Sequence, residues 1–174
     1  VSIGANLGLG EVMHFLSYRG RALAEDLEVI LRLFADVIQN PSFPPDQVDR
    51  LKAEKLTGLA MRDQDTGSVA ELAFSDLAYA GHPYRLPTEG TRESVARLTP
   101  EALRAFHRRK VGPARTVMAV VGAVAAEAAA EVVARHLADW QNPAQEPPLE
   151  LPALTPLAQT VRRDVPLAGK AQCA

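Results

Sequence analysis

Four histidines, His14, His82, His107 and His136, are the side chains of this sequence best suited to metal binding or to proton transfer near neutral pH. None of them stands in an H-x-x-E-H or H-E-x-x-H pattern, which places two imidazoles and a carboxylate on one face of a helix. We interpret His14 and His136 as structural residues. His107 follows Arg104 and precedes further basic residues, so we interpret it as part of a solvated helix cap. The histidines therefore predict no local metal motif.

His82-Pro83-Tyr84 is a stiffer feature, because proline fixes φ and the preceding Gly81 permits a tight approach of the chain. We interpret it as a structural turn whose His and Tyr tips are hydrogen-bonded. The sequence has no G-x-S-x-G nucleophile elbow, no Walker A loop and no G-x-G-x-x-G fingerprint. Cys173 has no histidine near it in sequence, which predicts an inert thiol.

The composition is that of an ordinary globular domain, with 174 residues, 47% hydrophobic and 23% charged. A net charge of −2 argues against nucleic acid or anionic lipid as a partner. A single cysteine excludes an intrachain disulfide framework and any multi-cysteine zinc site, and it does not indicate a cellular compartment. The longest near-apolar stretch, 116–130, includes Glu127 and is shorter than the roughly 20 residues of a membrane-spanning helix.

The elements that must position these side chains are predicted from hydrophobic periodicity. Alternation over 1–9 and 11–19, with a turn at Leu9-Gly10, predicts a β-hairpin. The period then changes to that of amphipathic helices. The first predicted helix runs from Ala22 to before Asn40, and the second follows Pro44. The third is capped by Thr66-Gly67-Ser68 and ended by Gly81. Two short helices capped by Thr91 and Thr99 follow, and the last helix runs from Ala125 to Trp140.

Two more strands are predicted in the second half of the chain. Residues 116–122 form a continuous apolar run with β-branched residues, which indicates a strand that is covered on both faces and central in its sheet. Five prolines between 141 and 156 predict a semi-rigid extended connector, followed by a last strand over 159–165. We therefore predict an α+β fold with a mixed, mainly antiparallel sheet and helices packed on one face.

The order of short motifs resembles the pitrilysin/insulinase family of zinc metallopeptidases, which includes the processing peptidases. The resemblance covers the whole chain, and its specificity lies in the ordered series rather than in any single piece. The matching pieces are Asn40-Pro41-Ser42-Phe43, Ala70-Glu71-Leu72, Tyr79-Ala80-Gly81-His82-Pro83-Tyr84, Glu89-Gly90, the run from Leu98 to His107, Gly112-Pro113, Val120-Val121-Gly122, Trp140, Val165-Pro166 and Gly169-Lys170-Ala171-Gln172.

The resemblance implies one of two homologous α/β halves that close like a clamshell around an extended peptide. In the catalytic half of such proteins an H-x-x-E-H helix supplies two zinc ligands and the general base, and a Glu of a later helix is the third ligand. The first helix would lie upstream of Val1, and the later ligand would fall near residues 58–61, where this chain has no carboxylate. Glu54 lies about one turn earlier and is flanked by Lys52 and Lys55, so we interpret it as a solvated surface residue.

This departure favours the non-catalytic half, in which we expect no catalytic, cofactor-binding or metal-binding residue. Zinc is expected only in the parent enzyme or its partner half, and the Arg/Tyr pair with which such halves hold the peptide would lie beyond Ala174. The resulting hypothesis is a fragment of an inactive domain that shapes a substrate chamber and helps hold extended peptides by strand addition. Its expected partners are a homologous catalytic half and a peptide substrate. Two alternatives stay open: an assembly subunit without a protease role, and part of a catalytic half.

The expected organisation is an α/β core over 1–140 that is truncated on its N-terminal side. A Pro-rich connector follows over 141–158, and the start of a strand region over 159–174. A strand already under way at Val1 and a last strand without a following cap suggest a piece of a longer polypeptide.

Overall fold

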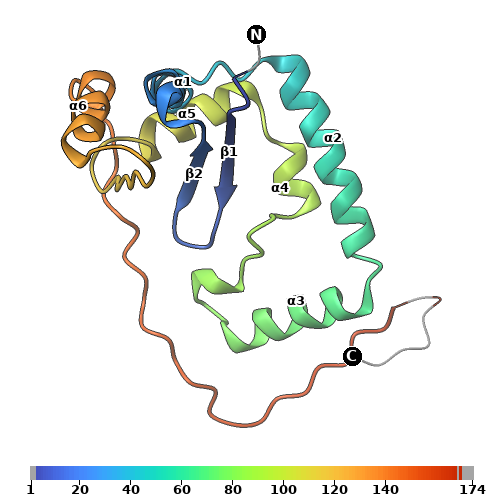
Figure 1. Cartoon of the computed structure of the whole chain (residues 1–174). Helices are drawn as coiled ribbons and strands as arrows, with labels where there is room; N and C mark the ends of the chain where they lie inside the picture. The colour runs from blue at the N-terminus through green and yellow to red at the C-terminus, as the bar shows by residue number, and fades with distance from the viewer. Residues whose placement is uncertain (1–2, 168, 170–174) are drawn as a thin grey trace. The chain divides into compact units, whose positions relative to one another are not determined.

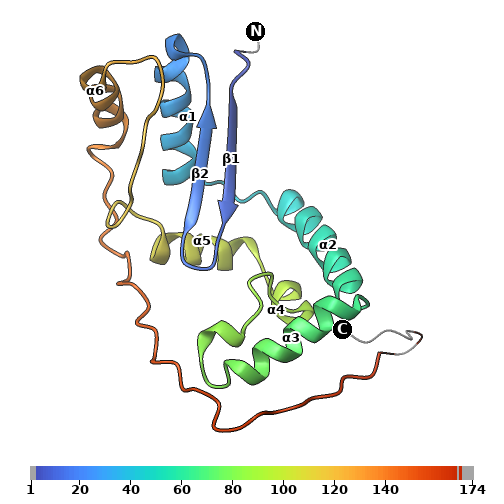
Figure 2. The same ribbon diagram turned by 60° about the horizontal axis from the view of Figure 1, so that its bottom comes forward.

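The computed structural model describes residues 3–167 and residue 169, and the chain divides into two compact units (Figures 1 and 2). The first comprises Val1–Phe43 and Glu101–Pro147, and the second comprises Pro44–Pro100 and Pro148–Ala174. The predicted features at Val1, at Lys170-Ala171-Gln172 and at Cys173 lie outside the described residues.

The first unit begins with the predicted hairpin. Strand β1 (Asn6–Glu11) pairs antiparallel with β2 (Leu16–Arg21), with Asn6 opposite Arg21 and Glu11 opposite Leu16. The prediction of a turn at Leu9-Gly10 was wrong, because the chain reverses over residues 12–15 instead. Gly10 lies within β1 instead of in the turn. Its carbonyl accepts a hydrogen bond from the Ser17 hydroxyl at 3.2 Å, and a Cβ on Gly10 would stand 3.0 Å from the oxygen of that hydroxyl.

Helix α1 (Leu27–Gln39), preceded by the short 3₁₀ helix η1 (Ala24–Asp26), packs along β2. The approach is close, because a Cβ on Gly20 would lie 2.9 Å from the Ile30 side chain. Tyr18 of β2 meets Phe34 of α1 edge to face, with 5.6 Å between the ring centroids. Burial of this ring raises the pKa of the Tyr18 phenol. The hairpin and α1 therefore pack directly against each other.

Helices α5 (Pro100–Lys110) and α6 (Ala126–Leu137) complete the helical part of the first unit, and α6 packs against α1. The buried residues of this unit that belong to helices are Ile30, Leu31, Ala35, Ile38 and Ala129. Val37 is half exposed, because Ala35 and Ile38 continue the buried stripe of α1.

The second unit is built from α2 (Pro45–Arg62), α3 (Thr66–Ala78), the 3₁₀ helix η2 (Pro83–Arg85) and α4 (Arg92–Ala96). Helix α2 begins at a proline, whose missing N–H matters little at a helix start. Thr91 caps α4 as predicted. The cap of α3 differs from the prediction: Asp65 accepts a hydrogen bond from the Ser68 N–H at 2.8 Å, because the cap residue must lie one position before the first helical residue.

The structure confirms an α+β fold, with many helices and a two-stranded antiparallel sheet in the described residues. The predicted strands over 116–122 and 159–165 were wrong for this chain. A strand requires a hydrogen-bonded neighbour, and neither segment has one among the described residues. The connector after Pro148 is likewise free of helix and strand where it is described (Figure 2). No helix in the described part of the chain combines the length and apolar character that a membrane span requires.

Candidate functional site

The segment Thr116–Gly122 is the most unusual feature of the first unit. Thr116 donates to the Pro113 carbonyl at 3.0 Å, and the Gly122 carbonyl accepts from Val124 at 2.9 Å. Between these two bonds, residues 117–121 make no main-chain hydrogen bond to the described residues. Val117 is 92% and Val121 96% exposed. Both main-chain edges of this stretch of strand-forming residues thus lack a hydrogen-bonded neighbour among the described residues.

The alternate side chains of this segment face a hollow beside α6. Met118 and Val120 line one side, and Ala126, Ala129, Val133 and Leu137 are among the residues that line the other. The volume is about 550 Å³, and every lining residue is apolar. We call the segment 117–121 together with this hollow the α6 groove. Its chemistry is that of an apolar binding surface bordered by unpaired main-chain donors and acceptors.

Helix α6, which forms the wall of the groove, is held to α1 by a small polar cluster. Glu28 of α1 accepts hydrogen bonds from Arg135 and His136, and Gln39 donates to the His136 carbonyl at 3.3 Å. Glu28 is thus bonded to two adjacent residues near the end of α6. The contact fixes α6 as a support for the groove.

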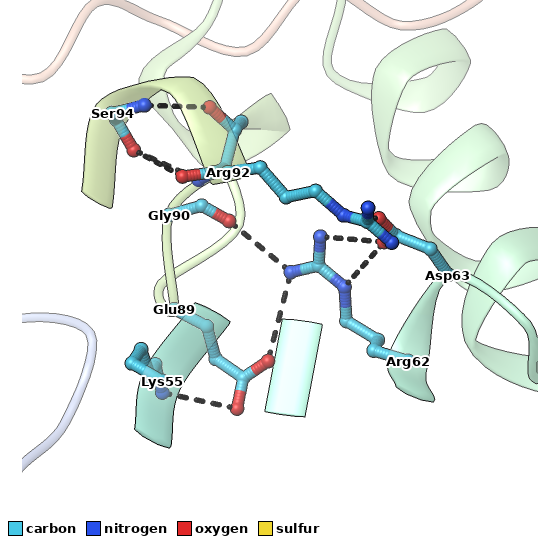
Figure 3. A network of polar contacts seen from close by, with 8 residues as sticks. Lys55, Arg62, Asp63, Glu89, Gly90, Arg92 and Ser94 are labelled. Carbon is cyan, nitrogen blue, oxygen red and sulfur yellow. Dashed lines mark hydrogen bonds and ion pairs between the residues drawn. The ribbon is translucent and has the colours of Figure 1, made fainter. Parts of the chain in front are cut away.

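A second polar network joins α2 to the loop before α4 in the second unit (Figure 3). Arg62, with 16% of its side chain exposed, donates to the Gly90 carbonyl at 3.2 Å and to Asp63 at 3.0 Å. Arg92 also contacts Asp63, at 2.9 Å. Glu89 lies between Lys55 at 3.4 Å and Arg62 at 3.6 Å. Each carboxylate therefore meets two cations, and the loop is fixed in place.

His82 is the buried polar residue of the second unit, with 6% exposure. Its Nδ1 accepts a hydrogen bond from the Tyr84 N–H at 3.2 Å, so Nε2 carries the proton and donates to the Pro152 carbonyl at 3.1 Å. The rings of Tyr79 and Tyr84 surround it, at centroid distances of 6.5 and 4.4 Å. The structure has a turn at His82-Pro83-Tyr84 in which the His82 ring is hydrogen-bonded, in part to the distant Pro152.

Three carboxyl groups have lowered pKa values for local reasons. Hydrogen bonds from Arg85 and Arg163 lower the pKa of Asp76, and hydrogen bonding to Lys110 lowers that of Glu146. The pKa of Glu93, at the start of α4, is lowered by hydrogen bonds from the backbone N–H of Glu93 itself and from the Thr91 hydroxyl. All three groups are stabilised as carboxylates, which suits structural ion pairs and helix caps rather than proton donation.

The described residues do not fit a zinc site. They contain no group of three His, Cys, Asp or Glu side chains close enough to share a metal. Glu54, the nearest carboxylate to the expected ligand position, is 71% exposed and pairs with Arg50 at 3.6 Å. At the expected position itself, Leu59 is 1% exposed. An apolar side chain there packs the helix and offers no metal ligand.

His14, His107 and His136 lie on separate elements of the first unit and do not form a common site with one another. His107 meets the Ile38 carbonyl at 2.8 Å and the ring of Phe43 edge to face, so it joins α5 to the end of α1 and is not the solvated cap that we expected. His14 lies in the hairpin turn and His136 on α6. The sequence predicted 116–122 as a central strand covered on both faces and did not reveal the α6 groove, whose signal was the run of alanines along one helix.

Residues 97–173 match the family described as the Peptidase M16 inactive domain. The chain is 32% identical over 135 residues to an uncharacterized zinc protease of Mycobacterium leprae, covering 78% of this chain and 30% of that protein. The crystal structure of a peptidase M16 inactive domain from Pseudomonas fluorescens superposes with a TM-score of 0.78 at 29% identity, over 87% of this chain and 37% of the other.

The chain belongs to the M16, or pitrilysin, family. It is similar to the inactive domain of M16 proteins, as the resemblance in the sequence implied. It is also 28% identical over 155 residues to cytochrome b-c1 complex subunit 1 of Mus musculus, over 89% of this chain and 32% of that subunit. The chain spans about a third of the length of the curated relatives that it matches.

Proposed function

We propose that this M16 inactive domain binds an extended peptide along residues 117–121 and holds it while a homologous half carries out zinc-dependent hydrolysis. The observation that carries the proposal is the main chain of these residues, which makes no hydrogen bond to the described part of the chain and lies beside the α6 groove. The domain itself contributes positioning and no reacting group.

Main-chain pairing supplies the affinity in this proposal. An extended peptide that lies along 117–121 can form the ladder of N–H to carbonyl bonds that this segment lacks. Because successive residues of a strand point their N–H groups to opposite edges, Ala119 serves one edge and Val120 the other. The same arrangement holds a peptide in a fixed register, which is what a positioning half must do.

The groove supports selection by side-chain character. The lining is apolar, and Val117 and Val121, on the opposite face of the segment, are exposed apolar residues. An apolar residue of a peptide that enters the groove loses contact with water, at about 25 cal/mol for each Å² of apolar surface buried. Peptides with alternating apolar residues are therefore the expected ligands.

The test measures the binding of a probe peptide to this chain. A fluorescein-labelled peptide, Lys-Thr-Val-Thr-Val-Thr-Lys, is titrated with the chain and its fluorescence anisotropy is recorded. We expect saturable binding that Ala119→Pro or Val120→Pro abolishes, because proline removes an N–H and blocks the ladder on one edge. The proline variant that abolishes binding identifies the edge of the 117–121 segment along which the peptide pairs.

Ala119→Val is the matched control, because it keeps the N–H and raises strand propensity at the same position. It is expected to bind at least as well as the native chain. Absence of saturable binding by the native chain, or binding that survives both proline variants, would refute the proposed site.

A second candidate function is supported by the match to cytochrome b-c1 complex subunit 1. In that case the same surfaces hold a neighbouring subunit, and the chain acts in assembly without a role in proteolysis. A chain that forms a stable complex with a homologous half, but whose partner hydrolyses peptides equally well without it, would favour this second function.

A further inference from the structure

Within the second unit, the end of the Pro-rich connector and the residues after it contact the corner of α3 and η2 at two points. We call residues 148–163 the strap. The carbonyl of Pro152 accepts a hydrogen bond from His82 at 3.1 Å, and Arg163 pairs with Asp76 of α3 at 3.0 Å. Residues 148–163 are otherwise exposed along their whole length. The position of the strap against the corner of α3 and η2 therefore depends on these two contacts.

The first contact has a fixed hydrogen-bond polarity. Nδ1 of His82 must be free of a proton to accept from the Tyr84 N–H, and Nε2 must carry one to donate to Pro152. Protonation of Nδ1 sets two donors against each other across 3.2 Å. It also places a charge on a ring that is only 6% exposed. The protonated ring is better accommodated in water, outside this turn.

The groups around His82 do not offset that charge by direct bonding. The titratable and charged groups of the surrounding elements are Glu71 and Asp76 of α3, Tyr79 just after that helix, Tyr84 and Arg85 of η2, and Glu150, Arg162 and Arg163 of the strap. Asp76 is bonded to Arg85 and Arg163, and both ring nitrogens of His82 are engaged by main-chain groups. A carboxylate partner for the imidazolium is therefore not in place at the ring.

The second contact responds to acid over a different range. Its arginine partners hold the pKa of Asp76 below the ordinary value of about 3.9. This carboxylate thus stays charged through the range in which a histidine gains its proton, and it protonates only at lower pH. The Arg163 contact therefore stays intact over the pH range in which histidines ordinarily take up a proton.

We propose that His82 is a pH-sensitive latch, which holds the strap at neutral pH and releases its Pro152 end in mild acid while Arg163 keeps the other end attached. Release uncovers the His82 turn with its two tyrosine rings. The strap then swings as a tethered extended segment, since its prolines keep it stiff.

The test follows the mobility of the strap in the full chain. Thr155 lies between the two contacts, so Thr155→Cys in a Cys173→Ser background accepts a fluorophore whose emission does not vary with pH. We expect its anisotropy to fall as the pH is lowered from about 7.5 to about 5, across the range in which histidines titrate. The decrease in anisotropy on acidification should equal the decrease that His82→Ala causes at neutral pH.

His82→Gln is the decisive variant, because its amide can donate to Pro152 and accept from Tyr84 but does not titrate in this range. It should hold the strap at both pH values. A label at Thr57→Cys on α2 should keep its anisotropy, which shows that the fold persists. An unchanged strap signal in the native chain, or the same fall with His82→Gln, would overturn the latch.

Discussion

Replacing Arg62 by methionine removes the charged centre of the network in Figure 3 and keeps most of the aliphatic volume of the side chain. The variant loses the hydrogen bond to the Gly90 carbonyl at 3.2 Å, the contact with Asp63 at 3.0 Å and the longer contact with Glu89 at 3.6 Å. The loop before α4 is then left without its principal tie to α2.

The expected loss can be built up contact by contact. A hydrogen bond that includes a charged group contributes about 1.5–3 kcal/mol, and the bond from Arg62 to Gly90 is of this kind, made by a side chain that is only 16% exposed. Asp63 keeps its bond to Arg92, so its loss is partly offset. The half-exposed Glu89 adds at most about 0.5 kcal/mol. Together these contacts predict a destabilisation of about 2–3 kcal/mol.

The measurement is urea-induced unfolding of the chain, followed by far-UV circular dichroism because the network lies among helices. Arg50→Met is the matched control on the same helix: its ion pair with Glu54 is exposed by 61% and 71%, and we expect a loss of about 0.5 kcal/mol or less. If Arg62→Met and Arg50→Met destabilise the chain equally, the reasoning about this network is wrong.

Further predictions concern single positions of the second unit. Leu59→Ala should lower the free energy of unfolding by about 2–5 kcal/mol in the same urea assay, because a fully buried side chain leaves a cavity. Gly90→Ala should destabilise by about 1–2 kcal/mol, since φ is +78° and the new Cβ would stand 2.9 Å from the Ser94 hydroxyl. Gly58→Ala on α2, where a Cβ meets no atom within 4 Å, should instead stabilise by about 0.5–1 kcal/mol. Asp76→Asn should reduce the Tm at neutral pH. Because the folded-state pKa of Asp76 is lowered, its stabilisation is complete above the unfolded value of about 3.9 and is lost as the pH falls through the folded value; the Tm difference should therefore vanish in strong acid.

The amphipathic helices were predictable because their signals are local. Pro45, the Thr91 cap and the stripe that contains Ile30 and Leu31 all act within a few residues, so α1, α2 and α4 form close to where the sequence predicts them. The hairpin was predicted, but its turn was not. The register depends on cross-strand contacts such as that of Gly10 with Ser17, which a single strand does not encode.

The strand predicted over 116–122 shows the limit of periodicity. Its residues favour extended structure, but they form no strand among the described residues, because a strand also needs a neighbour whose position no local pattern specifies. The same limit applies to the candidate sites. The α6 groove depends on the packing of α6 against α1, and the His82 latch joins residues 70 positions apart.

The sequence by itself determined the family, the order of the helices and the α+β class, because side-chain periodicity, caps and motif order are properties of neighbouring residues. Only the tertiary structure decided that 117–121 lies beside an apolar groove without a hydrogen-bonded neighbour in the described residues, that His107 joins two helices, and that His82 contacts the strap. These features are contacts between distant parts of the chain, and their free energy arises only when folding brings those parts together.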